Sequence, residues 1–383
     1  MTRVAIKPDM FRWARDRAGL DSLVLSARFP KLEAWETGEL QPTVRQLEDY
    51  ARATHAPVGY FFLPTPPDEP LPIPDFRTVG NRSIVRASPN LLDTVYICQE
   101  RQAWYRDDAL ISGQRPLPFV GSIETATAPV AAAEALRRAL GFSVEARRDC
   151  STWTEALRLF IEQADHIGVM VMVSGVVLNN STRHLDPQEF RGFALSDALA
   201  PLVFINGADS KAAQMFTLAH ELAHVWLGQT ALSDVSADTP PGNTVEAWCN
   251  QVAAELLVPM EAFLTELMAN EPIAETLKRL ARHFKVSSLV ILRRLLDAGR
   301  IDRATFFACY RAEMERLRDI ETKGSGGGDF YRTTAARVSK RFARALVEST
   351  LEGRTLYRDA FHMLGIAKTS TFNEFGRSLG FPT

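Results

Sequence analysis

The sequence predicts an α+β fold that is mainly helical, and two observations lead to that class. Apolar residues recur at helical spacing, with breaks at glycine and proline, through residues 8–63, most of 88–165 and 273–320. Three short apolar runs have the length and composition of strands, at 167–173, 190–195 and 201–205. We therefore expect one small antiparallel sheet, and a helical segment at the C-terminus.

The composition is that of an ordinary globular protein. Hydrophobic residues make up 46% and charged residues 23% of the 383 residues, a length that usually forms two or three domains. The formal net charge of −2 argues against strong electrostatic attraction of the whole protein to nucleic acid. Any surface that binds nucleic acid must therefore be a local one.

The cysteines and the apolar runs indicate where the protein works. Cys98, Cys150, Cys249 and Cys309 stand far apart and form no CxxC pair, so neither a disulfide framework nor a cysteine zinc site is expected. The first residues lack an apolar signal core, and the most apolar run, Ile167–Val173, is far too short to span a bilayer. We expect reduced thiols, a cytoplasmic location and no membrane contact.

Composition also suggests how the chain is divided. Residues 64–74 contain six prolines, which is typical of an extended connector. Glycines dominate 324–328, which is typical of a flexible link. The expected parts are an N-terminal helical domain (1–63), a proline-rich connector (64–87), a helical segment (88–165), a domain containing the sheet (166–300) and a helical C-terminal region that includes the link (301–383).

The most informative motif is His220-Glu221-Leu222-Ala223-His224, in a strongly helical stretch that Gly228 is expected to end. Residues four apart share one helix face, so His220 and His224 can present ring nitrogens to one zinc ion. Glu221 is placed to take a proton from metal-bound water and pass it to a leaving amine. The alternative is a pair of buried polar histidines with a solvated glutamate. We favour zinc.

A zinc hydrolase needs three protein ligands and an open position for water. The metzincin pattern would place a third histidine at position 230, which is Thr230. The helix predicted over 245–259 offers Glu246 instead. On the same face, Asn250 can accept the outer N–H of a zinc histidine and orient its ring.

Other residues compete for these roles. Glu255 on the same helix, and Asp234 or Asp238 in the loop before it, are weaker candidates for the third ligand. Glu246 also fits a capping box that begins at Asn243, which would make its role structural. We favour Glu246 as the ligand.

The two motifs together resemble those of the ImmA/IrrE family of bacterial zinc metallopeptidases. That family pairs HExxH with a downstream ExxA[ND]xFAxxLLMP segment, and this chain departs from it only at Cys249, Val252 and Val258. None of these positions is a ligand or the base. The resemblance implies a zincin-like, gluzincin-type domain whose small sheet lies over the HExxH helix. It also implies cleavage of a partner transcriptional repressor or antitoxin, which switches genes on.

The N-terminal region resembles the helix-turn-helix module of phage repressors, which many longer family members carry. The similarity lies in Trp35–Glu39, Gln41–Thr43 and Gln46–Glu48, and residues 73–78 resemble the connector that follows. The stretch that would enter the major groove, 29–39, has one lysine and three glutamates. Because carboxylates oppose binding to phosphates, we expect the module to recognise a partner protein and to bind DNA weakly.

DNA contact stays open as an alternative through the basic residues of the module. They are Arg3, Lys7, Arg12, Arg15, Arg28 and Lys31. Residues 1–63 hold nine Arg or Lys against eight Asp or Glu, so the charge of the module is almost balanced.

The C-terminal region is more basic, with nine Arg or Lys against five Asp or Glu in residues 329–383. An amphipathic basic helix is predicted over 335–346, either as a nucleic-acid patch or, as we favour, a solvated face that covers the adjacent domain. The histidines at 166, 283 and 362 stand singly, and core or surface roles are expected for them. His184 is a candidate for stabilising a transition state.

These observations predict a zinc-dependent endopeptidase with Zn²⁺ on His220, His224 and Glu246, and with Glu221 as general base and then acid. Two alternatives belong to other classes. One is an antitoxin-like regulator whose zinc site is structural or vestigial, and the other is a DNA-binding transcription factor. The intact Glu221 argues against the first, and the acidic stretch 29–39 argues against the second.

Overall fold

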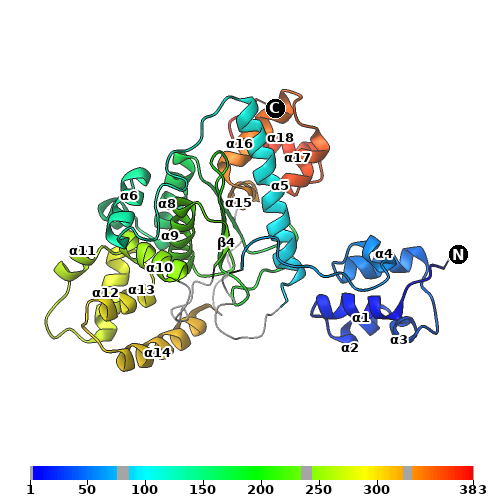
Figure 1. Ribbon diagram of the computed structural model, residues 1–383, viewed down its shortest axis with the longest axis horizontal. Helices are drawn as coiled ribbons and strands as arrows, with labels where there is room; N and C mark the ends of the chain where they lie inside the picture. Colours follow the sequence, from blue (N-terminus) through cyan, green and yellow to red (C-terminus); the bar gives the residue numbers. More distant parts are fainter. Residues whose placement is uncertain (1–2, 76–85, 234–243, 322–329, 383) are drawn as a thin grey trace. The chain divides into compact units, whose positions relative to one another are not determined.

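The computed structural model describes residues 3–75, 86–233, 244–321 and 330–382 (Figure 1). The chain divides into two compact units. The first unit comprises Met1–Pro72 with Ile84–Val95, and the second comprises Ile73–Ser83 with Tyr96–Thr383. Among the described residues the fold is α+β and mainly helical, as the sequence predicts, and it contains one four-stranded sheet.

The first unit begins with short helices. They are α1 (Pro8–Arg17), α2 (Ser22–Arg28), α3 (Leu32–Thr37), α4 (Val44–Ala53) and the 3-10 helix η1 (Val58–Phe62). Their core is aromatic: Phe11 packs against Trp35, Tyr50 and Phe61 at ring distances of 5.5–5.9 Å. Gly38 ends α3 in the left-handed conformation, which glycine adopts without strain.

The sheet is mixed, so the prediction of an antiparallel sheet is wrong in part. Its strands are β1 (Met170–Ser174), β2 (Gly192–Leu195), β3 (Leu202–Asn206) and β4 (Ala231–Leu232), in the order β1-β3-β2-β4. The pairs β2–β3 and β2–β4 are antiparallel, but β1–β3 is parallel. The chain reverses between β1 and β2 and again before β3. After these two reversals β3 has the same direction as β1, and because it lies between β1 and β2 it pairs with β1 in parallel.

The first predicted strand also begins later than expected. Helix α8 (Trp153–Ile167) continues to Ile167 and is ended by Gly168 in the left-handed conformation. Strand β1 therefore starts at Met170. The two residues of β4 escaped the sequence analysis because a strand of that length has no readable alternation.

Besides α8, the second unit contains α9 (Lys211–Leu227), which lies between β3 and β4 in the chain. The others up to residue 321 are α5 (Pro89–Ile111), α6 (Pro129–Leu140), α7 (Val144–Arg148), α10 (Thr244–Leu257), α11 (Met260–Thr265), α12 (Ile273–Phe284), α13 (Ser288–Asp297) and α14 (Arg303–Glu321). Strands β2 and β3 contact α9, and so do α8 and α10 (Figure 1). Helix α9 is thus enclosed between the sheet and other helices.

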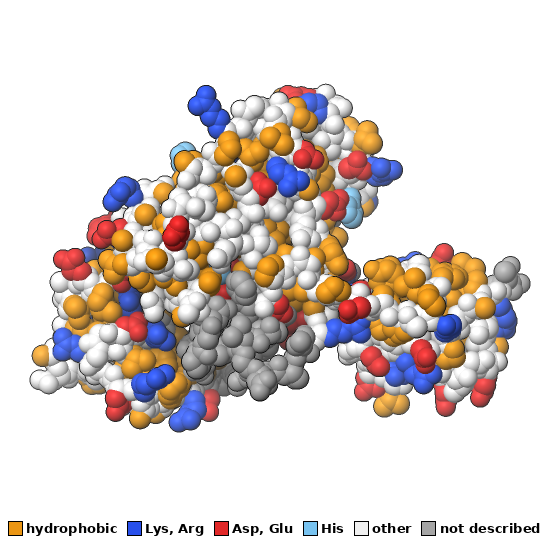
Figure 2. Space-filling view, in the orientation of Figure 1, with side chains coloured by type: hydrophobic (Ala, Val, Ile, Leu, Met, Phe, Trp, Pro, Cys, Tyr) orange, Lys and Arg blue, Asp and Glu red, His pale blue; other side chains and the backbone are white. Residues whose placement is uncertain are grey.

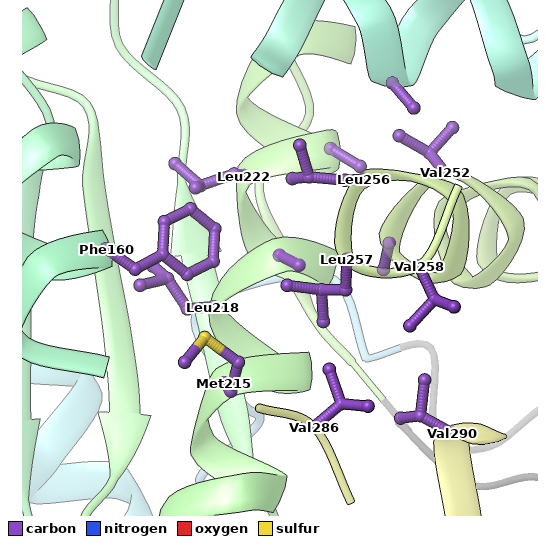
Figure 3. Close-up of a cluster of buried hydrophobic side chains, with 14 of the residues drawn as sticks. Phe160, Met215, Leu218, Leu222, Val252, Leu256, Leu257, Val258, Val286 and Val290 are labelled. Atoms are coloured by element: carbon purple, nitrogen blue, oxygen red, sulfur yellow. The ribbon is translucent and has the colours of Figure 1, made fainter. Parts of the chain in front are cut away.

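A large cluster of buried hydrophobic side chains packs one face of α9 against its neighbours. Figure 3 shows Met215, Leu218 and Leu222 of α9 facing Phe160 of α8 and the C-terminal half of α10. These positions of α9 are three and four residues apart, so they form one continuous face. All three side chains are 0% exposed. The polar residues of α9 therefore lie on a different face of the helix.

The C-terminal region contains α15 (Phe330–Val338), α16 (Lys340–Leu351), α17 (Tyr357–Leu364) and α18 (Thr369–Ser378), and α15 and α16 contact β1. The single basic helix predicted over 335–346 is wrong. Ser339 interrupts it at φ +67°, and its hydroxyl donates to Asp165 and accepts from the backbone N–H of Phe342. A side chain that is bonded on both sides in this way stabilises the break between two helices.

Basic residues of this region bind the rest of the unit. The guanidinium of Arg341 donates to Tyr105 and to the carbonyl of Asp165, and Arg337 donates to Asn179. These contacts favour the covering role over a nucleic-acid patch. On the face drawn in Figure 2, cationic and anionic side chains of this unit are interspersed. No helix in the described ranges is long and apolar enough to cross a membrane.

Candidate metal centre

The HExxH residues lie in the second half of α9, a helix with a local cap at each end. The Ser210 side chain accepts from the backbone N–H of Ala213 at the start of the helix, and Gly228 ends it in the left-handed conformation. Between them, His220, Glu221 and His224 are each 0% exposed. Three polar side chains buried in this way require partners, because an unsatisfied buried polar group costs free energy.

Glu246 of α10 supplies the main partner. Its Oε2 lies 3.1 Å from Nε2 of His220, and its Oε1 lies 3.0 Å from Nε2 of His224. The two Nε2 atoms are 3.2 Å apart. Among the described residues, these three form the one group of His, Cys, Asp and Glu side chains whose ligand atoms converge closely enough to hold a metal ion.

The spacing of these atoms fits a tetrahedral zinc site. Bonds of about 2.0–2.2 Å in tetrahedral geometry place neighbouring ligand atoms about 3.4 Å apart. The observed separations of 3.0–3.2 Å are within a few tenths of that value. Two imidazoles and one carboxylate are also a donor set that zinc hydrolases use, with one position left for water.

Asn250, one turn after Glu246, lies where the sequence analysis placed it. Its Oδ1 is 2.9 Å from Nδ1 of His220, and an amide oxygen can only accept, so Nδ1 is the protonated nitrogen. In the neutral ring, Nε2 then carries a lone pair that points toward the Glu246 carboxylate. Electron pairs that converge in this manner call for a cation between them, which is the physical sign that the residues fit a metal.

Electrostatics in the site follow from burial and from these partners. Burial raises the pKa of Glu221 to about 8. Burial would also raise the pKa of Glu246, but the two histidines that face it lower that pKa to about 2. Glu246 is therefore an anion throughout the physiological range, as a metal ligand must be.

Strand β2 passes directly beside the motif, and Gly192 allows the close approach. A Cβ added at Gly192 would lie 2.5 Å from Cγ2 of Thr217, 2.8 Å from the carbonyl oxygen of Phe204 and 3.4 Å from Cγ of Glu221. Any side chain at this position would therefore collide with Thr217 of α9 and with the backbone of β3, at the point where β2 passes Glu221. A glycine within a strand often marks such a close approach.

Of the rival ligands, the structure describes Glu255, and this residue is not brought to the site. Glu255 binds the guanidinium of Arg294 and the backbone N–H of Met260, so it belongs to the end of α10. Asp234, Asp238 and Asn243 lie outside the described residues, and so does the glycine-rich stretch 324–328. His184 is exposed and forms an isolated bridge with Val176 in the connection after β1.

The basic residues proposed for DNA or partner contact lie in the first unit. Arg12 pairs with Asp9, Arg28 lies over the ring of Phe29, and Lys31 is exposed just before α3. Arg15 donates to both carboxylate oxygens of Glu36 at 2.7 Å. This pair makes Glu36, one of the three glutamates expected to meet a partner, an internal partner of Arg15.

Two residues beside Glu221 were not predicted from the sequence. Besides Gly192, Ser233 lies directly after β4 and donates from Oγ to Oε2 of Glu221 at 3.3 Å. A glycine inside an apolar run was a readable signal for Gly192. Ser233 had no such signal, because a lone serine after an unpredicted strand is indistinguishable from any loop serine.

A helix that carries two converging histidines and a buried glutamate, completed by a glutamate from the next helix, has the groups that a metallopeptidase uses. Residues 164–296 match the sequence model Peptidase_M78, the IrrE N-terminal-like domain, which supports the ImmA/IrrE family over that range. Residues 338–378 match a domain of unknown function, DUF8813. A comparison with curated proteins gives no match.

Proposed function

We propose that this protein is a zinc-dependent endopeptidase that cleaves a partner transcriptional repressor or antitoxin and so controls gene expression. The convergence of His220, His224 and Glu246, in the region that matches the IrrE N-terminal-like domain, supports the proposal most strongly. The zincin-like, cytoplasmic character of the enzyme is part of the same proposal.

In the proposed reaction, three residues bind the metal and one transfers protons. His220, His224 and Glu246 would hold the zinc ion, with His220 oriented by Asn250. Bound zinc would supply the charge that acidifies a water molecule and polarises a peptide carbonyl. Glu221 would accept the proton of the attacking water and return it to the leaving amine.

A structural or vestigial zinc site is the runner-up. A structural zinc site is usually closed by four protein ligands, whereas three protein ligands converge here among the described residues. Such a site would also have no use for Glu221, whose burial beside Glu246 places two carboxylates close together. Burial of a second carboxylate is costly and is typical of a functional site.

The first unit would recognise the substrate protein with its repressor-like helix-turn-helix. The ion pair between Arg15 and Glu36 supports this, since it removes one of the cations available to phosphates. Glu33 and Glu39 are exposed beside it and can pair with cations of a partner. A DNA-binding regulator is the second alternative, and it requires strong affinity for a specific sequence at physiological salt.

The test uses the full chain, zinc and the repressor or antitoxin encoded by a neighbouring gene. Glu221→Gln should keep zinc, because Glu221 is not a ligand, and should abolish cleavage of the partner. The matched control is Glu261→Gln, which makes the same chemical change at an exposed position on α11 and should cleave as the wild type does. Unchanged cleavage and gene induction by Glu221→Gln would rule out proteolysis as the activity.

A further inference from the structure

Among the described residues, Ser233 is the one whose hydroxyl donates a hydrogen bond to Glu221. Its Oγ lies 3.3 Å from Oε2 of Glu221, and Ser233 is 1% exposed while Glu221 is 0% exposed. The distance is long for a hydroxyl, but contacts of catalytic groups are often long before substrate binds. No donor among the described residues reaches the other oxygen, Oε1.

Within the described ranges, one carboxylate oxygen of Glu221 accepts a hydrogen bond and the other does not, and this difference matters for a group that must transfer a proton. A carboxylate rotates easily about its last torsion, so an unrestrained glutamate presents its oxygens in many directions. A donor on one oxygen fixes the plane of the carboxylate and leaves the other oxygen to accept the proton. A misplacement of about 1 Å at such a group can reduce the rate by about a hundredfold.

Ser233 in turn depends on β4, which is held on both sides. On its inner side, Leu232 and Ala231 pair with Phe193 and Ala194 of β2. On its outer side, the backbone N–H of Leu232 donates to the carbonyl of Pro74 at 2.9 Å. Leu232 is also bridged in parallel to Asp75, two residues after Ile73, which is 6% exposed.

A strand of two residues has little stability of its own, so its outer partner contributes to its position. We propose that Ser233 is a positioning residue that orients Glu221, and that residues 73–75 of the connector, which pair with β4, keep Ser233 in place. The expected effect of Ser233 on catalysis rests on the proposed function. The connector would then help to position a catalytic residue, in addition to linking two parts of the chain.

Substitutions of equal size isolate the hydroxyl. Ser233→Ala should lower kcat about 10- to 100-fold, the range for residues that support a reacting group, with KM and zinc content unchanged. Ser233→Thr and Ser233→Val have the same shape but differ in the hydroxyl, so the threonine variant should retain much more activity than the valine variant. Wild-type kcat in Ser233→Ala, or equal rates in the threonine and valine variants, would overturn the proposal.

A double-mutant cycle tests the connector. Ile73→Ala should lower kcat when Ser233 is present and should have no further effect in Ser233→Ala, because both changes act through one contact. Leu71→Ala, a change of similar size just outside the pairing, is the control and should leave kcat unchanged. Effects of Ile73→Ala and Ser233→Ala that simply multiply would remove the connector from the proposal.

A measurement without catalysis separates this inference from the proposed function. In urea unfolding of the zinc-loaded protein, Ser233→Ala should lower the midpoint when Glu221 is present and should not lower it further in Glu221→Ala. Equal shifts in both backgrounds would show that the two side chains are not coupled. If the wild type cleaves no partner, the proposed function fails, and the urea cycle still decides whether Ser233 holds Glu221.

Discussion

Replacing Gly192 by alanine is expected to destabilise the second unit and to disturb Glu221 at the same time. Gly192 lies on β2 where the strand crosses α9, and its backbone leaves no room for a methyl group. The added Cβ would lie 2.5 Å from Cγ2 of Thr217 and 2.8 Å from the carbonyl oxygen of Phe204. Ordinary contacts between such atoms are about 3.5–4.0 Å.

The magnitude follows from what must move. Relief of the contact with Thr217 requires a displacement of about 1 Å, since the optimum lies near 3.5 Å. The second clash is with backbone of β3, which is paired with β2 in register, so the strands cannot simply separate. Overpacking of this kind costs about 1–3 kcal/mol, a substantial part of the 5–15 kcal/mol that stabilises a typical domain.

Urea unfolding of Gly192→Ala and of the wild type measures this cost, and zinc content and partner cleavage report on the site. Thr217→Ser removes the methyl group of the closest contact, so the double variant should recover part of the loss. Gly59→Ala is the control: nothing lies within 4 Å of its added Cβ, and its effect should be within about 0.5 kcal/mol. A Gly192→Ala protein as stable and as active as the wild type would refute the close approach.

Further outcomes are expected. Glu246→Ala should lose zinc by elemental analysis; zinc loss in Glu255→Ala instead would make Glu255 the ligand. Glu255→Ala should keep zinc and lose about 1–3 kcal/mol of stability, because the buried Arg294 loses its nearest carboxylate and keeps Asp297 at 3.7 Å and the carbonyl of Val258. Burial raises the pKa of Asp165 from 3.8 to about 6, so its ionised form destabilises the fold. Asp165→Asn should therefore match the wild type in urea below about pH 4 and exceed it increasingly as the pH rises to 6 and above; an equal difference at both ends would refute this. Binding of the full chain to duplex DNA, followed by fluorescence anisotropy, should be weak and fall steeply with salt. Nanomolar, sequence-specific affinity at physiological salt would contradict that expectation.

Features that depend on neighbours in sequence could be predicted from the sequence. The placement of His220 and His224 on one face follows from the period of a helix, and the end of α9 follows from the local signal at Gly228. Asn250 on the face of Glu246 follows from the same geometry. For these residues the inference needed only the assumption that two segments form helices and meet.

Features that depend on which segments meet could not be predicted in this way. Strand β1 pairs in parallel with β3 because β3, which has the same direction as β1, lies between β1 and β2, and nothing in either strand encodes that neighbour. The break at Ser339 depends on Asp165, which lies 174 residues earlier and accepts its hydroxyl. An isolated stretch 335–346 has the pattern of one helix, and the tertiary contact is what divides it.

The candidate site likewise combines features that depend on neighbours in sequence with features that depend on contacts between distant segments. Local spacing was enough to predict a helix that carries two histidines and a glutamate, and a second helix that offers a carboxylate and an amide, since the helical period fixes which residues share a face. Three features came from the packing of distant segments: Glu246 faces the histidines and Glu255 does not, Gly192 lets β2 approach Glu221, and Ser233 reaches Glu221 from β4. The reason is that contacts between distant segments depend on packing of the whole unit, which no local pattern contains.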